Sequence, residues 1–204
     1  MGLHKTKEID RLGLAKQWMI PAILLTAGII AELFGDAGRE WLRYDRVAIP
    51  HGESWRLISG HITHLGWQHL TLNGCGLVLV WFLVGRAIEV RYWLPIIAII
   101  VATIDVSFWL LNPELYWYVG MSGLLHGLLV AGAVARLPTW DGETIALLGL
   151  LTAKVAWEQF SGPMPGSEST SGGPVVIDAH LYGAIGGLLG ALVTRIRVGR
   201  HAAI

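Results

Sequence analysis

The stretch WYVGMSGLLHG, residues 117–127, opens an apolar run long enough to cross a membrane as a helix. It carries one hydroxyl, Ser122, between Gly120 and Gly123. A serine in a membrane helix commonly bonds a carbonyl one turn back or holds two helices together. The neighbouring glycines remove bulk from one face, so another backbone or a substrate can approach the hydroxyl. This stretch makes Ser122 a candidate functional residue, which the rest of the chain has to support.

The composition of the chain is that of a membrane protein with several spans. Of its 204 residues, 53% are hydrophobic and 15% are charged, whereas about 25% are charged in a typical soluble domain. The mean hydropathy is +0.54. The net charge is zero, which gives no reason to expect nucleic acid as a partner, and the single Cys75 cannot form an internal disulfide. The first apolar run is followed by an Arg- and Trp-rich segment, so it is interpreted as a span and not as a cleaved signal peptide.

Six apolar runs predict an all-α membrane protein of one domain, residues 18–196, with six transmembrane helices. The predicted spans are residues 18–34, 67–84, 93–111, 118–135, 143–160 and 178–196. Ten lysines and arginines fall in the tails and connections of one side, against four in the long loop of the other side. Because cationic residues favour the cytoplasmic side, both tails, residues 1–17 and 197–204, are predicted to be cytoplasmic.

Two connections on the outer side stand out by composition. The loop at residues 35–66 mixes apolar side chains with arginines, which indicates amphipathic structure lying at the membrane interface. The loop at residues 161–177 is rich in Gly, Pro and Ser, so it is either a plain flexible connector or a lid over a site.

Polar residues of three predicted spans fall in one shallow layer near the outer surface. Ser122 lies some four residues into the fourth span, which is ~6 Å at about 1.5 Å per residue. His180 lies near the outer end of the sixth span, while His69 and Asn73 share one face of the second. Polar groups within a span are costly and commonly functional, so this layer is the predicted active site.

A serine and a histidine in such a layer indicate acyl transfer. An imidazole can take the proton of the hydroxyl, which predicts a catalytic dyad of Ser122 and His180. We expect no orienting carboxylate, because Asp178 is two residues from His180 and lies on a different face of the helix. The oxyanion of the reaction needs fixed donors. The candidates for this role are Asn73, His69, Gly120 and the backbone N–H of Ser122.

Small residues on the sixth span predict how the two catalytic residues meet. Gly183 and Gly187 share one face, and Gly186 and Gly190 share another. Such faces allow close packing, so we expect the fourth and sixth spans to touch and to bring the hydroxyl within hydrogen-bond reach of the imidazole.

Together these motifs resemble the rhomboid intramembrane serine proteases, over about residues 50–195. The motifs that carry the resemblance are Trp55-Arg56, His64, His69-x-x-x-Asn73, Gly120-x-Ser122-Gly123 and His180-x-x-Gly183-x-x-x-Gly187. The resemblance implies a six-helix, rhomboid-like bundle with a water-filled cavity open to the outside and no cofactor. It also implies Ser122 as the nucleophile, His180 as the base, and Asn73 with His69 as the oxyanion donors. The residues expected to support this site structurally are His126, His64, Trp55, Arg56, Gly123, Gly183 and Gly187.

Three stretches resemble the rhombosortase branch of that family: residues 120–127 (GMSGLLHG), 157–159 (WEQ) and 178–183 (DAHLYG). That branch is associated with bacterial proteins that end in a Gly-Gly motif, an apolar helix and a basic tail. The resemblance implies removal of this tail at the periplasmic side of the inner membrane, with transmembrane protein substrates and the lipid bilayer as partners. A Gly-Gly pair fits such a cut, because each Gly weakens a helix by about 1 kcal/mol relative to Ala and leaves the backbone free to extend into a narrow cleft.

Several polar residues keep more than one interpretation. Many bacterial rhomboids carry a Tyr one turn after the serine, where this chain has His126; we expect a supporting role, with a second base or a metal ligand as alternatives. Lys154 and Glu158 are spaced to pair with each other, unless Glu158 gates the site or contacts the substrate. Asp105 is expected to pair with an Arg or a Trp N–H. The loop histidines lack the compact spacing of a zinc site, so no metal is predicted.

Two other classes of function are weighed against the protease. A non-catalytic rhomboid-like protein that binds membrane helices would be expected to lack Ser122 or His180, and both are present. A small transporter would be expected to carry polar groups near the bilayer midplane and inverted repeats, and the sequence shows neither. The natural substrate, the scissile bond, the oligomeric state, and whether water or another nucleophile takes the acyl group stay open.

Overall fold

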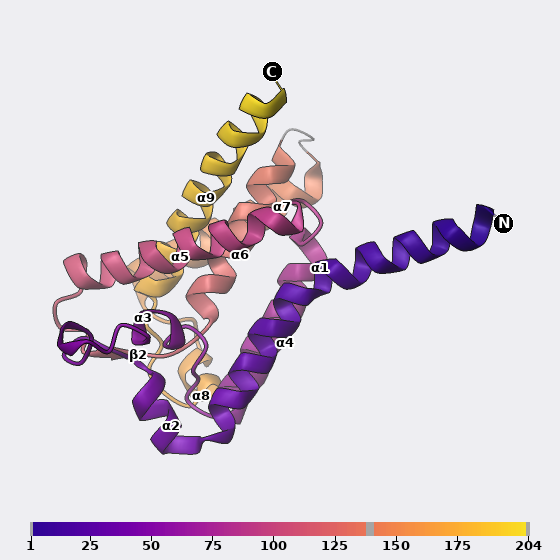
Figure 1. Cartoon of the computed structure of the whole chain (residues 1–204). Coiled ribbons are helices and arrows are strands. Elements are labelled where there is room, and N and C mark those ends of the chain that lie inside the picture. The colour runs from indigo at the N-terminus through magenta and orange to yellow at the C-terminus, as the bar shows by residue number, and fades with distance from the viewer. Residues whose placement is uncertain (1, 138–140, 203–204) are drawn as a thin grey trace.

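The computed structural model describes residues 2–137 and 141–202, with side chains described for residues 16–137 and 141–194. Within these ranges a long helix forms at each position predicted to span the membrane (Figure 1). These helices are α1 (Gly2–Leu33), α4 (Trp67–Val84), α5 (Val90–Leu111), α6 (Ser122–Arg136), α7 (Gly142–Ser161) and α9 (Asp178–Ala202). By length and composition, three segments of the described chain could cross a membrane, namely Lys16–Leu33, Trp67–Val84 and Val90–Leu111, and α6 is a shorter apolar helix.

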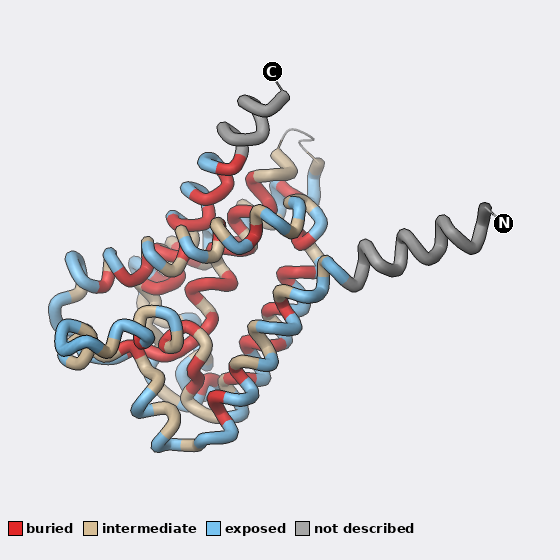
Figure 2. The backbone as a smooth tube through the Cα atoms, viewed as in Figure 1, coloured by how far each residue is buried: buried red, intermediate tan, exposed pale blue. Residues whose placement is uncertain are grey.

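Helix α6 lies at the centre of the bundle, where it contacts α4, α5, α7 and α9 (Figure 1). Most of its residues are buried, among them Leu124, Leu128 and Ala131. Figure 2 colours most of this helix as buried. Helices α4 and α5 bury one side only, yet their exposed sides are also apolar: Phe82 is 77% exposed and Leu94 is 70% exposed. A helix that is apolar on its exposed face needs an apolar solvent, so these surfaces indicate an integral membrane protein.

Glycines set the distance between α6 and α9. A Cβ atom on Gly183 would lie 2.0 Å from the Gly123 carbonyl oxygen, and one on Gly187 would lie 2.1 Å from that of Gly127. The two backbones are therefore in direct contact, which confirms the predicted packing of these helices. The second glycine face of α9 has a different partner from the one expected, because Gly186 and Gly190 pack on α5.

The start of α6 differs from the prediction. Tyr118 belongs to a short strand, β2 (Trp117–Tyr118), which pairs antiparallel with β1 (Tyr44–Asp45). Between the strand and the helix, Gly120 has φ +134°, a conformation that a helix does not contain, and its N–H donates to the Gly60 carbonyl at 3.1 Å. Ser122 is thus the first residue of α6 and does not lie four residues inside a helix.

The long loop between α1 and α4 contains α2 (Gly35–Leu42), β1, η1 (Ile49–His51) and α3 (Arg56–Ser59). Arg56 is buried within it, where its guanidinium contacts the Glu53 carboxylate at 2.6 Å and donates to the carbonyls of Glu40 and Arg43 at 2.8 and 2.9 Å. Trp55 donates its indole N–H to the Trp41 carbonyl at 3.3 Å. The loop at residues 161–177 contains the short helix α8 (Ser167–Ser171), which packs on α4, so it is not a plain connector.

Polar contacts tie α5 to the start of α9 and to the long loop before α4. Asn112, just after α5, donates to the Asp178 carboxylate at 2.6 Å and accepts from the Tyr182 hydroxyl at 2.8 Å, which fixes the start of α9. Asp105 of α5 contacts His61 at 3.1 Å. The expectation of an Arg or Trp partner for Asp105 was therefore wrong, because the partner is supplied by a loop 44 residues earlier in the chain.

Candidate active site

The predicted serine and histidine meet near the N-terminal ends of two helices. Ser122 is the first residue of α6, and His180 is the third residue of α9. The Nε2 atom of His180 lies 2.9 Å from the Ser122 Oγ atom. The glycine contact between α6 and α9 explains this approach, because it brings the two backbones together one turn below the pair.

The other ring nitrogen of His180 meets a carboxylate. Its Nδ1 atom lies 2.8 Å from Oε2 of Glu158 on α7. The expectation that no carboxylate is placed to orient His180 was therefore wrong: the structure shows a chain of contacts from serine to histidine to glutamate. The sequence held a signal for it, since Glu158 lies near the end of α7 and α9 begins on the same side of the membrane in the predicted topology.

Lys154 and His126 contact the residues of the Ser122–His180–Glu158 series. The Lys154 Nζ atom is 2.8 Å from Oε1 of Glu158, which confirms the predicted pair, and 3.0 Å from Nε2 of His126. The His126 Nδ1 atom is 2.7 Å from the Ser122 carbonyl oxygen. The rings of His126 and His180 stack with centroids 4.2 Å apart and an angle of 15° between their planes.

Three of these residues are close enough together to be considered as metal ligands. One donor atom each from His126, Glu158 and His180 lies within 4.8 Å of the other two. The Lys154 ammonium already supplies a cation to this group, because it contacts both His126 and Glu158. A metal ion would have to displace Lys154, so the donor set fits a hydrogen-bonded network better than a metal centre.

Two of the proposed oxyanion donors, His69 and Asn73, lie on α4. The expectation that Gly120 supplies a third donor was wrong, because its N–H already donates to the Gly60 carbonyl at 3.1 Å. His69 accepts the Leu65 N–H at its Nδ1 atom, 3.3 Å away, which leaves Nε2 as the protonated nitrogen. A Cβ on Gly120 would lie 3.4 Å from that Nε2 atom, so His69 borders the turn that leads to Ser122. Asn73 is buried one turn further along α4, where one amide N–H is donated to the His69 carbonyl at 3.1 Å.

The other predicted supporting residues lie outside the hydrogen-bonded chain. His64, in the loop before α4, is buried with its ring edge-on to His69 at 5.1 Å between centroids. Burial, with a smaller effect of His69, lowers the pKa of His64 to about 3, so His64 is neutral. Trp55 and Arg56 lie in the loop before α4, where they make the contacts given above, whereas Gly123, Gly183 and Gly187 form the contact between α6 and α9.

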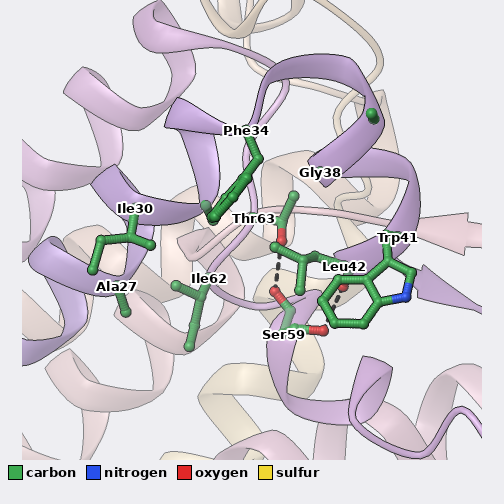
Figure 3. Close-up of a pocket in the computed structure, with 11 residues that line it drawn as sticks. Ala27, Ile30, Phe34, Gly38, Trp41, Leu42, Ser59, Ile62 and Thr63 are labelled. Carbon is green, nitrogen blue, oxygen red and sulfur yellow. Dashed lines mark hydrogen bonds between the residues drawn. The ribbon is translucent and has the colours of Figure 1, made fainter.

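A separate pocket of about 600 Å³ lies between α1, α2 and the segment that follows α3 (Figure 3). Its lining is apolar except for Ser59 and Thr63, and both hydroxyls donate to backbone carbonyls. No titratable side chain lines this pocket, so it offers no base to activate either hydroxyl.

Comparison with known families identifies a rhomboid domain in the chain. The model of the rhomboid domain matches residues 51–197, a range that includes Ser122, His180, Glu158 and the α4 residues of the site. No curated protein matches the chain. Because the family model covers well over half of its length, the chain belongs to the rhomboid family of intramembrane serine proteases.

Proposed function

We propose that this chain is a serine endopeptidase that uses Ser122 as its nucleophile and His180 as its general base. The observation that carries the proposal is the 2.9 Å contact between Ser122 Oγ and His180 Nε2 at the head of α6. A nucleophile and a base within hydrogen-bond distance are the minimum that acyl transfer from a serine requires. Proteins of the rhomboid family act on transmembrane protein substrates within the bilayer, which is the class of substrate expected here.

The reaction follows from the positions of the two residues. His180 takes the hydroxyl proton at Nε2 as Ser122 Oγ attacks the carbonyl carbon of the scissile peptide bond. The protonated imidazole then gives this proton to the nitrogen of the leaving amine, and the C–N bond breaks. A second nucleophile, water in the simplest case, releases the acyl group and restores the serine hydroxyl.

The oxyanion of each tetrahedral intermediate would form near the first turn of α6. The N–H groups of that turn have no partner within the helix, and the helix dipole favours negative charge there. His69, whose Nε2–H borders Gly120, and Asn73 are the proposed side-chain donors. Donors of this kind contribute about 10²- to 10³-fold to the rate each.

The proposed substrate is the C-terminal sorting signal implied by the resemblance: a Gly-Gly pair, an apolar helix and a basic tail. A helical peptide bond is shielded by its own hydrogen bonding, and a Gly-Gly pair weakens the helix at the cut. The resemblance implies the bacterial inner membrane, and the charge pattern favours cytoplasmic termini, so the site would face the periplasm.

The test is to co-express the protein with a membrane reporter that ends in this signal. Wild type is expected to release the tail, and Ser122→Ala is expected to leave it attached, because losing the nucleophile removes nearly all of the catalysed rate. Ser54→Ala is the matched control, since Ser54 is an exposed loop serine and this variant should process the reporter like wild type.

Each outcome decides a different part of the proposal. Processing by both wild type and Ser122→Ala, with a reporter that stays intact in cells lacking the protein, would show that Ser122 is not the nucleophile. Processing in cells that lack the protein would show that a host protease acts on the reporter. If wild type cleaves a generic rhomboid substrate but leaves the Gly-Gly reporter intact, the catalytic assignment holds and the substrate class is wrong. A protein that binds the reporter and cleaves nothing would support the non-catalytic alternative.

A further inference from the structure

The contacts around Ser122 and His180 close into a ring. One path runs from Ser122 Oγ through the two nitrogens of His180 to Glu158, with contacts of 2.9 and 2.8 Å. The other path runs from the Ser122 carbonyl through the two nitrogens of His126 to Lys154, with contacts of 2.7 and 3.0 Å. The Lys154–Glu158 contact at 2.8 Å joins the paths.

One arrangement of protons satisfies every contact in this ring. Lys154 can only donate, so Nε2 of His126 accepts and its Nδ1–H donates to the Ser122 carbonyl. Glu158 can only accept when ionised, so Nδ1–H of His180 donates to it. The Nε2 atom of His180 is then left as an acceptor for the Ser122 hydroxyl, which is the tautomer that a general base needs. The ring therefore fixes the proton on the productive side of the imidazole.

The burial of Glu158 shows why it needs these partners. Its side chain is 1% exposed, and each carboxylate oxygen has one close contact, Oε1 with Lys154 and Oε2 with His180. An unpaired carboxylate at such a position would be costly. Lys154 is 35% exposed at its side chain, and the pair is neutral as a whole. This arrangement holds a negative charge beside the imidazole without leaving a net charge on the Lys154–Glu158 pair.

We propose that Glu158 is a positioning residue for His180, held in place by Lys154, so that the catalytic unit is Ser122–His180–Glu158 and not a dyad. This inference rests on the proposed function.

When Ser122 attacks, its O–H bond breaks and the proton forms an N–H bond at Nε2, which gives His180 a positive charge. Glu158 offsets that charge through its contact at Nδ1, and His126 fixes the Ser122 backbone through its own bond. Lys154 also lies 3.4 Å from Nδ1, further than Glu158, so the nearer carboxylate dominates.

The test measures kcat and KM of the purified full-length protein in detergent on a peptide or membrane substrate that wild type cleaves. Glu158→Gln keeps the size of the side chain and removes its charge. It is expected to lower kcat by about 10²- to 10⁴-fold with little change in KM, as for other carboxylates that orient a catalytic histidine. Glu158→Asp keeps the carboxylate and should recover part of this loss. Glu143→Gln is the matched control, because Glu143 lies in the exposed first turn of the same helix, and it should match wild type.

A double-mutant cycle separates positioning from folding. Lys154→Met alone leaves Glu158 buried without its cation, whereas Lys154→Met with Glu158→Gln removes both charges together. The double variant is expected to unfold at a temperature close to that of wild type and to be no slower than Glu158→Gln, because Lys154 acts through Glu158. The proposal would be overturned if the losses in kcat of Lys154→Met and Glu158→Gln added in the double variant. It would also be overturned if Glu158→Gln had the kcat of wild type.

These results are distinct from a failure of the proposed function. If wild type cleaves nothing and Ser122 does not react with a fluorophosphonate, the protease assignment fails and the role of Glu158 falls with it. If wild type is active, Ser122→Ala is inactive and Glu158→Gln equals wild type, the chain is a dyad protease and only the positioning role is wrong.

Discussion

At the scale of single residues, the candidate site depends on the contact between Ser122 Oγ and His180 Nε2 at 2.9 Å. The shallow depth of both residues in their predicted spans led us to expect that they meet. Glu158 was missed, because its spacing from Lys154 shows which residues share a face of α7 but not which helix that face meets. The His61–Asp105 contact was also missed, because the spacing of residues within α5 does not show that a distant loop supplies the partner of Asp105.

The buried loop residue His64 predicts how the stability of the folded protein depends on pH. Its pKa is lowered from 6.5 to about 3 by burial, with a smaller effect of His69, so the folded protein holds it neutral. The unfolded chain takes up a proton near pH 6.5, so the stabilising effect of neutral His64 is complete above that pH and is lost progressively as the pH falls towards about 3. Between pH 7 and pH 5 this one residue should cost about 2 kcal/mol of stability.

Thermal unfolding in detergent at the two pH values checks this expectation. His64→Phe keeps an aromatic ring at this position and removes the group that takes up a proton. It should reduce the loss of stability on going from pH 7 to pH 5. The same loss in His64→Phe as in wild type would contradict it. His51→Phe is the control, because His51 is exposed in the same loop.

At the scale of elements, the periodicity of apolar residues predicted where helices form and the glycines predicted which two of them touch. The start of α6 was placed four residues too early, because an apolar sequence does not distinguish a strand and a turn from a first helical turn. Pairing of Trp117–Tyr118 with a loop more than 70 residues earlier decides that boundary. This boundary matters for function, because it makes Ser122 the first residue of α6, where the backbone N–H groups have no partner within the helix.

The contact between α6 and α9 predicts the effect of one methyl group. Gly183→Ala would place a Cβ 2.0 Å from the Gly123 carbonyl oxygen, so the helices must separate. We expect a loss of about 1–3 kcal/mol in stability, together with loss of cleavage, because His180 would move away from Ser122. Gly149→Ala is the control on α7, where a Cβ meets nothing within 4 Å. It should be neutral or stabilising by up to about 1 kcal/mol. Equal effects of the two substitutions would contradict the packing account.

At the scale of the whole molecule, composition predicted a membrane protein, and the exposed apolar faces of α4 and α5 agree with it. The orientation rests on the distribution of charge along the chain and not on packing. The charge pattern predicts cytoplasmic termini.

Fusions test this topology directly. Green fluorescent protein at the C-terminus should fluoresce, because it folds in the cytoplasm. Alkaline phosphatase inserted at Gly52 of the long outer loop should be active, because it requires the periplasm. The opposite pattern of reporter activity would mean that the chain has the opposite orientation, with Ser122 on the cytoplasmic side.

The central claim is that the contact between Ser122 and His180 makes this serine a nucleophile. The most direct measurement is labelling of the protein in its membranes with a serine-directed fluorophosphonate, followed by mapping of the modified peptide. The account predicts a label on Ser122 that disappears in His180→Ala, while the exposed Ser54 stays unlabelled. An unlabelled Ser122 in wild type, or equal labelling in His180→Ala, would contradict it.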